Sequence, residues 1–292
     1  DEGMPSLAAL AESQGYETTA FHPYKSSGWN RPLAYHDLDF DDQMYEEDVV
    51  NPQYTRHYVS DASDFQMIFQ TTQQQVKSFF FNVTMQNHSG YAQGWNNLER
   101  TISLPDSLKL ADSNAEQYFA LARQTDNALR ELIGYYSQCD EPTMIVFFGD
   151  HQPPLKNAFY ERLYGKPLDQ RTTEEVMRQY AVPFFIWTNY DLSGAEADMQ
   201  TEDVVISPNY LGVLTAKLAG LPLTGYMNFL DQMYAELPAI TPVGFVTRDG
   251  DFLSKKELSD QQQDWLDQYA ILNYCGMVDL FDEARPMFCA EE

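Results

Sequence analysis

Three short segments of the chain carry side chains suited to phosphate or metal chemistry. In the first segment, His22, Trp29 and Arg31 follow an apolar run that predicts a strand over 18–21. Arginine can bind phosphate oxygens through two parallel N–H bonds, tryptophan offers a flat wall, and histidine can donate to an anionic oxygen. The three residues therefore form a candidate anion site. The alternative is an ordinary loop followed by a helix that packs through Trp29.

The second segment places a carboxylate beside an imidazole after another apolar run. Residues 144–148 are Met-Ile-Val-Phe-Phe, and Gly149, Asp150 and His151 follow them. Adjacent side chains on a straight strand point to opposite faces, so both can reach one ion only if the chain turns here. Gly149 and the two following prolines permit such a turn. Mixed oxygen and nitrogen ligands suit Zn²⁺ or Mn²⁺, and the alternative is a capping aspartate beside a loop histidine.

The third segment carries His88, which follows an apolar run over 79–85. Three of the five histidines in the chain thus lie just after predicted strands. Open α/β sheets bind ligands at the carboxyl ends of their strands, so we expect His22, His88 and His151 to line one cleft. His36 and His57 lack a comparable context, and we interpret them as structural or surface residues.

The elements that must position these residues alternate between strand and helix patterns. Short continuous apolar runs predict buried parallel strands over 79–85, 144–148 and 183–188. Helical patterns cover 7–13, 60–75, 114–137 and 209–219. The alternation predicts an α/β fold with a mostly parallel central sheet and helices on both faces.

The C-terminal part differs in character. Residues 243–253 predict a hairpin around Arg248-Asp249-Gly250-Asp251, and 261–274 predict an amphipathic helix. We expect one domain, with residues 1–240 as its main portion and residues 241–292 as a small C-terminal subregion. Because the chain opens on a helix that leads into a strand, we also expect it to begin in the middle of an α/β alternation.

The composition limits the classes of partner. Lys and Arg total 18 against 44 Asp and Glu, which gives a formal net charge of −26. Such a surface repels nucleic acid, so an anionic substrate must be held locally by a metal or a few cationic groups. No apolar run approaches the length of a membrane helix, and we expect this chain itself to be soluble. Cys139, Cys275 and Cys289 lack metal-ligand spacing; a Cys275–Cys289 bridge and free thiols both remain open.

These segments together carry a resemblance to a known family. The chain resembles the lipoteichoic acid synthase and phosphoglycerol transferase branch of the alkaline phosphatase/sulfatase superfamily. The resemblance runs in order from about Met4 to about Leu230 and then weakens. The residues that carry it are Gly15-Tyr16, His22, Trp29-Asn30-Arg31, Tyr35, Asn87-His88 and Gly149-Asp150-His151-Gln152-Pro153.

The resemblance implies a role for each candidate residue. Asp150 and His151 match metal ligands, while His22, Trp29 and Arg31 match the pocket for the glycerol phosphate headgroup. His88 matches a histidine that assists the leaving oxygen at phosphorus. The family transfers phosphoglycerol from phosphatidylglycerol, through a phosphoglyceryl-threonine, to a polyol-phosphate chain or glycan. The family uses a divalent metal, usually Mn²⁺, with Mg²⁺ or Zn²⁺ as alternatives. Its members work outside the bacterial cytoplasmic membrane.

The chain departs from the family pattern in one respect. In relatives the threonine nucleophile and a glutamate ligand lie upstream of the position of Asp1, so we expect this chain to be a C-terminal portion that is inactive alone. We expect any membrane anchor to lie in that upstream segment. Two alternatives stay open. One is a sulfatase, phosphodiesterase or phosphoethanolamine transferase on the same fold, and the other is a surface protein that binds without turnover.

Overall fold

The computed structural model describes residues 4–91, 94–192, 204–278 and 284–289. The chain divides into two compact units, and each is described by itself. The first unit contains Asp1–Leu10, Pro142–Gln152 and Arg171–Glu292, and the second unit contains Ala11–Glu141 and Pro153–Gln170. The boundary at residue 240 that we expect from the sequence stays a prediction.

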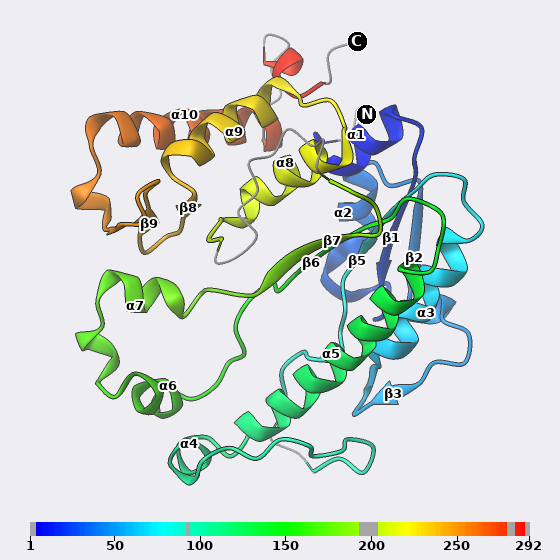
Figure 1. Cartoon of the computed structure of the whole chain (residues 1–292), viewed down its shortest axis with the longest axis vertical. Coiled ribbons are helices and arrows are strands. Elements are labelled where there is room, and N and C mark those ends of the chain that lie inside the picture. The colour runs from blue at the N-terminus through cyan, green and yellow to red at the C-terminus, as the bar shows by residue number, and fades with distance from the viewer. Residues whose placement is uncertain (1–3, 92–93, 193–203, 279–283, 290–292) are drawn as a thin grey trace. The chain divides into compact units, whose positions relative to one another are not determined.

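The second unit is built on a three-stranded parallel sheet. Its central strand β1 (Glu17–His22) pairs with β2 (Asp42–Tyr45) on one side and with β5 (Ser78–Asn82) on the other (Figure 1). The side chains of 18–22 are all buried, as expected for a strand covered on both faces. The prediction of an α/β fold with a parallel sheet is confirmed here.

Helices pack against this sheet through apolar side chains. Phe21 of β1 and Met67 of α3 belong to one buried cluster. Helix α3 begins after Ser60, whose hydroxyl accepts a hydrogen bond from the Ser63 amide, the contact typical of an N-cap. Helix α1 (Leu7–Ser13) spans the boundary between the units at Leu10 and Ala11. The other helices of this unit are α2 (Arg31–Asp37), α3 (Asp61–Thr72), α4 (Asp106–Ala111), α5 (Ala115–Tyr136) and α6 (Asn157–Tyr164).

A short hairpin that we did not predict lies between the second strand and α3. Its strands are β3 (Tyr54–Thr55) and β4 (Tyr58–Val59), which pair antiparallel. Arg56 lies in the turn and has a left-handed backbone with φ of 57°. Single turns of 3-10 helix cover Gly28–Asn30, Glu46–Asp48 and Leu168–Gln170.

The first unit contains a correction to the predicted sheet. Strand β6 (Met144–Phe148) pairs antiparallel with β7 (Phe184–Thr188), and the two form a separate two-stranded sheet. Our prediction of parallel strands at these two runs is therefore wrong. The reason is physical: a continuous apolar run reports burial on both faces, and burial is the same for either strand direction.

The rest of the first unit is mainly helical. Its buried core contains Tyr210, Leu230, Met233 and Phe245. The predicted C-terminal hairpin is present as β9 (Phe245–Val246) and β10 (Phe252–Leu253). The predicted helix 261–274 lies within α10 (Asp260–Met277). The other elements are α7 (Thr173–Arg178), α8 (Pro208–Ala219), α9 (Gly225–Glu236), β8 (Ala239–Ile240) and single 3-10 turns at Lys255–Glu257 and Arg285–Met287.

Across the described ranges, no helix is both long enough and apolar enough to cross a membrane.

Candidate functional site

His22 is the last residue of β1, at the carboxyl edge of the parallel sheet. Its side chain is 1% exposed, and its ring centroid lies 5.5 Å from that of Trp29. Burial, the nearby Arg31 charge and His88 together lower the pKa of His22 to about 4. His22 is therefore neutral near pH 7. Its buried Nδ1 has no hydrogen-bond partner among the described residues.

Trp29 is presented by a strained turn. Trp29 and Asn30 both have a φ of 53°, a left-handed conformation that costs roughly 1–3 kcal/mol for a residue other than glycine. The neighbouring Gly28 leaves room for Tyr24, since a Cβ there would lie 3.0 Å from the Tyr24 ring. The indole of Trp29 is nevertheless 56% exposed, so burial does not explain the strain. The turn holds a large flat surface open to solvent beside His22.

Arg31 brings the positive charge. It begins α2, and its Nη1 donates to the Tyr35 hydroxyl at 2.8 Å. Its Cζ lies 5.8 Å from the Trp29 ring and 5.7 Å from the Tyr35 ring. Its buried Nε has no partner among the residues that the structure describes. An arginine with an unused donor is a suitable ligand for an anion.

His88 reaches the same cluster from the loop after β5. Its ring centroid lies 5.8 Å from Trp29 and 5.7 Å from Tyr58. The Tyr58 hydroxyl lies 3.1 Å from His88 Nδ1. The structure thus brings together four of the six residues that we selected from the sequence: His22, Trp29, Arg31 and His88. We call these four residues with Tyr24 and Tyr58 the aromatic cluster.

Two members of this cluster were missed from the sequence. The Tyr24 ring lies 5.2 Å from Trp29 and 6.1 Å from Tyr58. Tyr24 follows His22 by two residues, and that proximity was an available signal. Tyr58 lies in the unpredicted hairpin, thirty residues before its partner His88, and no local pattern connects the two. His57 is exposed, as we interpreted it, although Arg56 and His88 help to lower its pKa after the larger effect of burial.

A buried polar network anchors the loop that carries His88. The Gln86 side chain accepts from the Asp61 amide at 3.1 Å, and Asn87 Nδ2 donates to the Thr125 hydroxyl at 2.7 Å. Asp61 and Asp64 are fully buried, at 1% and 0% exposed. Burial raises the pKa of Asp61 to about 6, and burial with the nearby Asp61 raises the pKa of Asp64 well above its usual range. The burial of Asp61 and Asp64 could not be predicted from the sequence, because aspartates in a first helical turn are typical of solvated caps.

Asp150 and His151 lie in the first unit, after β6. The Gly149 amide donates to the Pro183 carbonyl, and a Cβ at Gly149 would lie 2.9 Å from the Val182 Cβ, so glycine is required there. Asp150 Oδ2 and His151 Nε2 are 3.4 Å apart, and both side chains are exposed. The predicted turn therefore does bring the two side chains together.

This pair fits part of a metal site. Two donors about 2.1 Å from an ion and 3.4 Å apart subtend roughly the tetrahedral angle. His151 Nδ1 lies 2.9 Å from the Gln152 carbonyl, an arrangement that leaves Nε2 for a ligand. Across the described residues, no group of three or more His, Cys, Asp or Glu side chains has metal-site geometry. The pair alone therefore supplies only two ligands.

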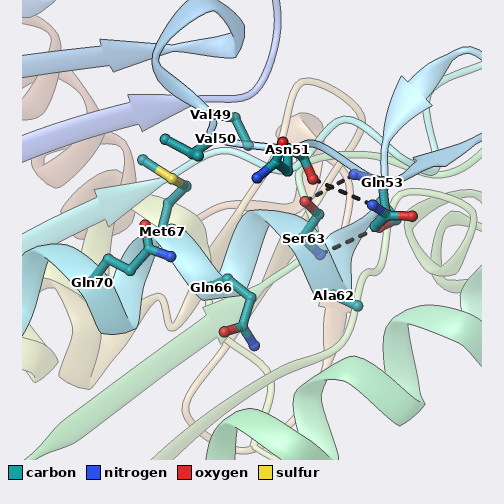
Figure 2. A pocket seen from close by; sticks show the side chains of 10 residues that line it. Val49, Val50, Asn51, Gln53, Ala62, Ser63, Gln66, Met67 and Gln70 are labelled. Carbon is teal, nitrogen blue, oxygen red and sulfur yellow. Dashed lines mark hydrogen bonds between the residues drawn. The ribbon is translucent and has the colours of Figure 1, made fainter.

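A separate cavity lies beside α3. Its volume is about 230 Å³, and Figure 2 shows side chains from α3 and from the segment before β3 around it. All ten of its lining residues are neutral: Val49, Val50, Asn51, Gln53, Ser60, Ala62, Ser63, Gln66, Met67 and Gln70. It lacks the cationic and imidazole groups that phosphate chemistry needs. The aromatic cluster is therefore the better candidate site.

Comparisons with known proteins agree with this reading of the fold. A Rhizobium meliloti (strain 1021) protein described as "Putative cyclic beta-1,2-glucan modification protein" is 28% identical over 270 residues, which cover 91% of this chain. The match spans 40% of that protein, so this chain covers less than half of the relative's length.

Three solved structures share the fold at low sequence identity. The Streptococcus pyogenes phosphoglycerol transferase GacH, in complex with sn-glycerol-1-phosphate, has a TM-score of 0.67 at 18% identity over 95% of this chain and 66% of that one. The Listeria monocytogenes lipoteichoic acid synthase LtaP has a TM-score of 0.60 at 17% identity over 93% and 73%. The C-terminal periplasmic domain of EcEptC from Escherichia coli, in complex with Zn, has a TM-score of 0.52 at 21% identity, over 74% of this chain and 62% of that one.

The match to a family model extends over most of the chain. Residues 1–221 fit the model described as Sulfatase. These residues include all six of the side chains that we selected from the sequence, from His22 to His151. This protein belongs to the sulfatase family.

Proposed function

We propose that this chain forms the headgroup-binding part of a phosphoglycerol transferase. The reaction moves phosphoglycerol from a phosphatidylglycerol-type lipid to a polyol-phosphate or glycan acceptor of the cell envelope. The observation that carries the proposal is the convergence of His22, Trp29, Arg31 and His88 at one edge of the parallel sheet.

The cluster offers the groups that a glycerol phosphate needs. Arg31 supplies a fixed positive charge in a chain whose net charge is −26, so the anion is held locally. The buried Nδ1 of His22 and the buried Nε of Arg31 have no partner among the described residues, so both are polar groups that the described contacts leave unsatisfied beside the exposed Trp29 ring. The exposed Trp29 ring supplies a wall for the glycerol carbons.

His88 is the proposed donor to the leaving oxygen. In the proposed first step, a threonine oxygen outside this chain forms a bond to phosphorus, and the bond from phosphorus to the diacylglycerol oxygen breaks. His88 donates a hydrogen bond from Nε2 to that oxygen as negative charge develops on it. None of the residues described here is assigned as nucleophile, so we expect no turnover from this chain alone.

Asp150 and His151 would hold a divalent metal through Oδ2 and Nε2. Such an ion, when bound, neutralises charge on phosphoryl oxygens and lowers the pKa of a nucleophilic hydroxyl. Mn²⁺ is our expectation from the family resemblance, with Mg²⁺ or Zn²⁺ as alternatives; the mixed oxygen and nitrogen ligands by themselves suit Zn²⁺ or Mn²⁺.

The acceptor and the location are inferred from the relatives. One relative is named for cyclic glucan modification, one neighbour for lipoteichoic acid synthesis, and one neighbour is a periplasmic domain. We infer a glycan or polyol-phosphate acceptor and a site of action on the outer face of a bacterial cytoplasmic membrane.

Calorimetry with glycerol phosphate tests this proposal. We expect the chain to bind sn-glycerol-1-phosphate, and Arg31→Gln to weaken that binding roughly tenfold, the usual size for a lost charge-assisted hydrogen bond. Arg130→Gln is the matched control, because Arg130 is an exposed arginine of the same unit that pairs with Asp126. The absence of binding, or an equal effect of both substitutions, would contradict the proposal.

Calorimetry also distinguishes phosphoglycerol transfer from a second candidate function. A sulfatase, phosphodiesterase or phosphoethanolamine transferase would use the same fold, and one neighbour is the periplasmic domain of EcEptC. Tighter binding of phosphoethanolamine or of a sulfate ester than of glycerol phosphate would favour this candidate.

A further inference from the structure

The hairpin β3–β4 makes two kinds of contact with the segment that carries His88. Arg56, in the turn, is 4% exposed, and its Nη2 donates to the carbonyls of Gln86 and His88, each at 2.7 Å. Its Nη1 donates to the Gly90 carbonyl at 3.4 Å. Tyr58, on β4, contacts the imidazole itself. The hairpin thus contacts both the backbone and the side chain at His88.

The backbone of Arg56 is strained, and the contacts of its side chain account for that strain. A left-handed turn position favours glycine, asparagine or aspartate, and an arginine there is strained. The turn is held by Asn97, whose Nδ2 donates to the carbonyls of Tyr54 and Arg56. The strain is accounted for by what the side chain reaches, namely three carbonyl groups within 86–90.

The charge of Arg56 is also held without a counter-ion. Within the described residues no carboxylate forms an ion pair with it, and its Cζ instead lies 5.3 Å from the Tyr58 ring and 5.5 Å from the Tyr91 ring. A buried guanidinium is costly unless its donors are satisfied, and both Nη atoms donate to carbonyls, while the buried Nε has no partner among the described residues. Two donors from one planar group fix the relative positions of residues 86 and 88.

Tyr58 acts on the ring rather than on the backbone. Burial raises the pKa of Tyr58, so its hydroxyl keeps its proton and can donate to His88 Nδ1. An imidazole that accepts at Nδ1 carries its proton on Nε2. That tautomer can donate from Nε2 to a phosphate or leaving-group oxygen, whereas the opposite tautomer cannot.

We propose that Arg56 and Tyr58 are positioning residues for His88, the first fixing the segment 86–90 and the second selecting the tautomer protonated at Nε2. The role of His88 as donor rests on the proposed function, but the positioning does not. The two are therefore tested by different measurements.

Nitrogen NMR of the histidine rings reads the tautomer directly. In the wild-type chain, above the titration range of histidine, we expect the His88 ring to be protonated at Nε2. Tyr58→Phe should convert it to a mixture of tautomers, while Tyr54→Phe should leave it unchanged. Tyr54 is the control because it lies on the same hairpin and its hydroxyl donates to Glu46 instead. A wild-type His88 protonated at Nδ1, or an unchanged ratio in Tyr58→Phe, would overturn the proposal.

Amide hydrogen exchange tests Arg56. The His88 amide donates to the Met85 carbonyl at 3.0 Å, and its exchange reports the order of the segment. Arg56→Lys keeps the charge but loses the planar pair of donors, so we expect exchange to accelerate roughly tenfold to a hundredfold. Arg130→Lys is the control and should have no effect. Equal protection of the His88 amide in Arg56→Lys and wild type would overturn the role of Arg56.

Ligand binding distinguishes this inference from the proposed function. If glycerol phosphate does not bind while His88 shows the expected tautomer and protection, the proposed function fails and the positioning stands. If glycerol phosphate binds but the tautomer is wrong, the positioning fails and the proposed function stands.

Discussion

The indole of Trp29 packs edge-on against the imidazole of His22, with ring centroids 5.5 Å apart and planes inclined at 70°. One of these residues is fully buried at the end of a strand, and the other is exposed in a left-handed backbone conformation. A strained and exposed aromatic residue beside a buried neutral histidine is typical of a binding surface rather than of a core.

Trp29→Gly should separate stability from binding. Glycine accepts a φ of 53° without strain, but the substitution also removes the indole's contacts with the His22, Tyr24 and His88 rings, so the two effects oppose each other and the free energy of unfolding should change by no more than about 1 kcal/mol. Affinity for glycerol phosphate should fall roughly tenfold, because the ring contact is lost. Urea unfolding and calorimetry measure the two effects.

Asp39→Gly is the control for that substitution. Asp39 also has a left-handed backbone, with a φ of 57°, and its backbone amide donates to the His36 carbonyl rather than to the aromatic cluster. Its replacement should raise stability without changing affinity. A Trp29→Gly protein that binds glycerol phosphate as tightly as wild type would contradict our account of the turn.

The low pKa of His22 predicts a pH dependence of stability. Between about pH 6.5 and 4 the unfolded chain takes a proton at this position and the folded chain does not. The contribution of His22 is therefore fully present above pH 6.5 and is lost as the pH falls toward 4, by at most about 3 kcal/mol. Arg31 and His88 face His22, and both act in the same direction on its pKa.

The measurement must compare two proteins, because Asp61 acts in the opposite direction. The pKa of Asp61 is raised to about 6, so its contribution is lost as the pH rises from about 3.8. The unfolding free energy of wild type minus that of His22→Asn should increase with pH over this window. A difference that stays constant from pH 4 to 6.5 would show that His22 is not held neutral.

Asp64→Asn should stabilise the second unit near neutral pH. Asp64 is fully buried with a strongly raised pKa, so folding at pH 7 opposes its ionisation. An amide removes that cost, still accepts from Asn82 Nδ2, and offers a donor to Asn82 Oδ1, which has no partner among the described residues. We expect a gain on the order of 1 kcal/mol in urea unfolding. Asp126→Asn, at an exposed position, should lose no more than about 0.5 kcal/mol, the usual contribution of an exposed ion pair such as the one with Arg130. A loss of stability in Asp64→Asn would contradict burial as the dominant effect.

Divalent ions should bind the Asp150–His151 pair weakly. Two ligands give little affinity, and Asp150→Ala leaves only one, so Mn²⁺ binding measured by electron paramagnetic resonance should disappear in that variant. Asp249→Ala, in the loop between β9 and β10 of the same unit, is the control and should bind Mn²⁺ like wild type. Equal binding by wild type and Asp150→Ala would remove this pair from the metal site.

Much of the fold could be predicted from the sequence, because burial and periodicity are local signals. The helix after Ser60 and the central strand that ends at His22 follow from a capping residue and a continuous buried run. Strand direction is not encoded in such a run, and the antiparallel pairing of β6 with β7 was therefore beyond the sequence.

The candidate site divides in the same way. His22, Trp29 and Arg31 are close in sequence, and their types indicate an anion site. Tyr58 and Arg56 act across thirty residues or more from a turn with no glycine or asparagine, so neither composition nor spacing marks them. Contacts of this kind exist only in the folded chain.

The most direct test of the central claim is to map where glycerol phosphate binds. Titration of the labelled chain with sn-glycerol-1-phosphate, followed by NMR, should shift the ring signals of His22 and His88 and the indole signal of Trp29, while the exposed His36 remains unchanged. Shifts confined to the neutral cavity beside α3, or an unshifted Trp29 indole at saturation, would contradict the assignment of the aromatic cluster as the headgroup site.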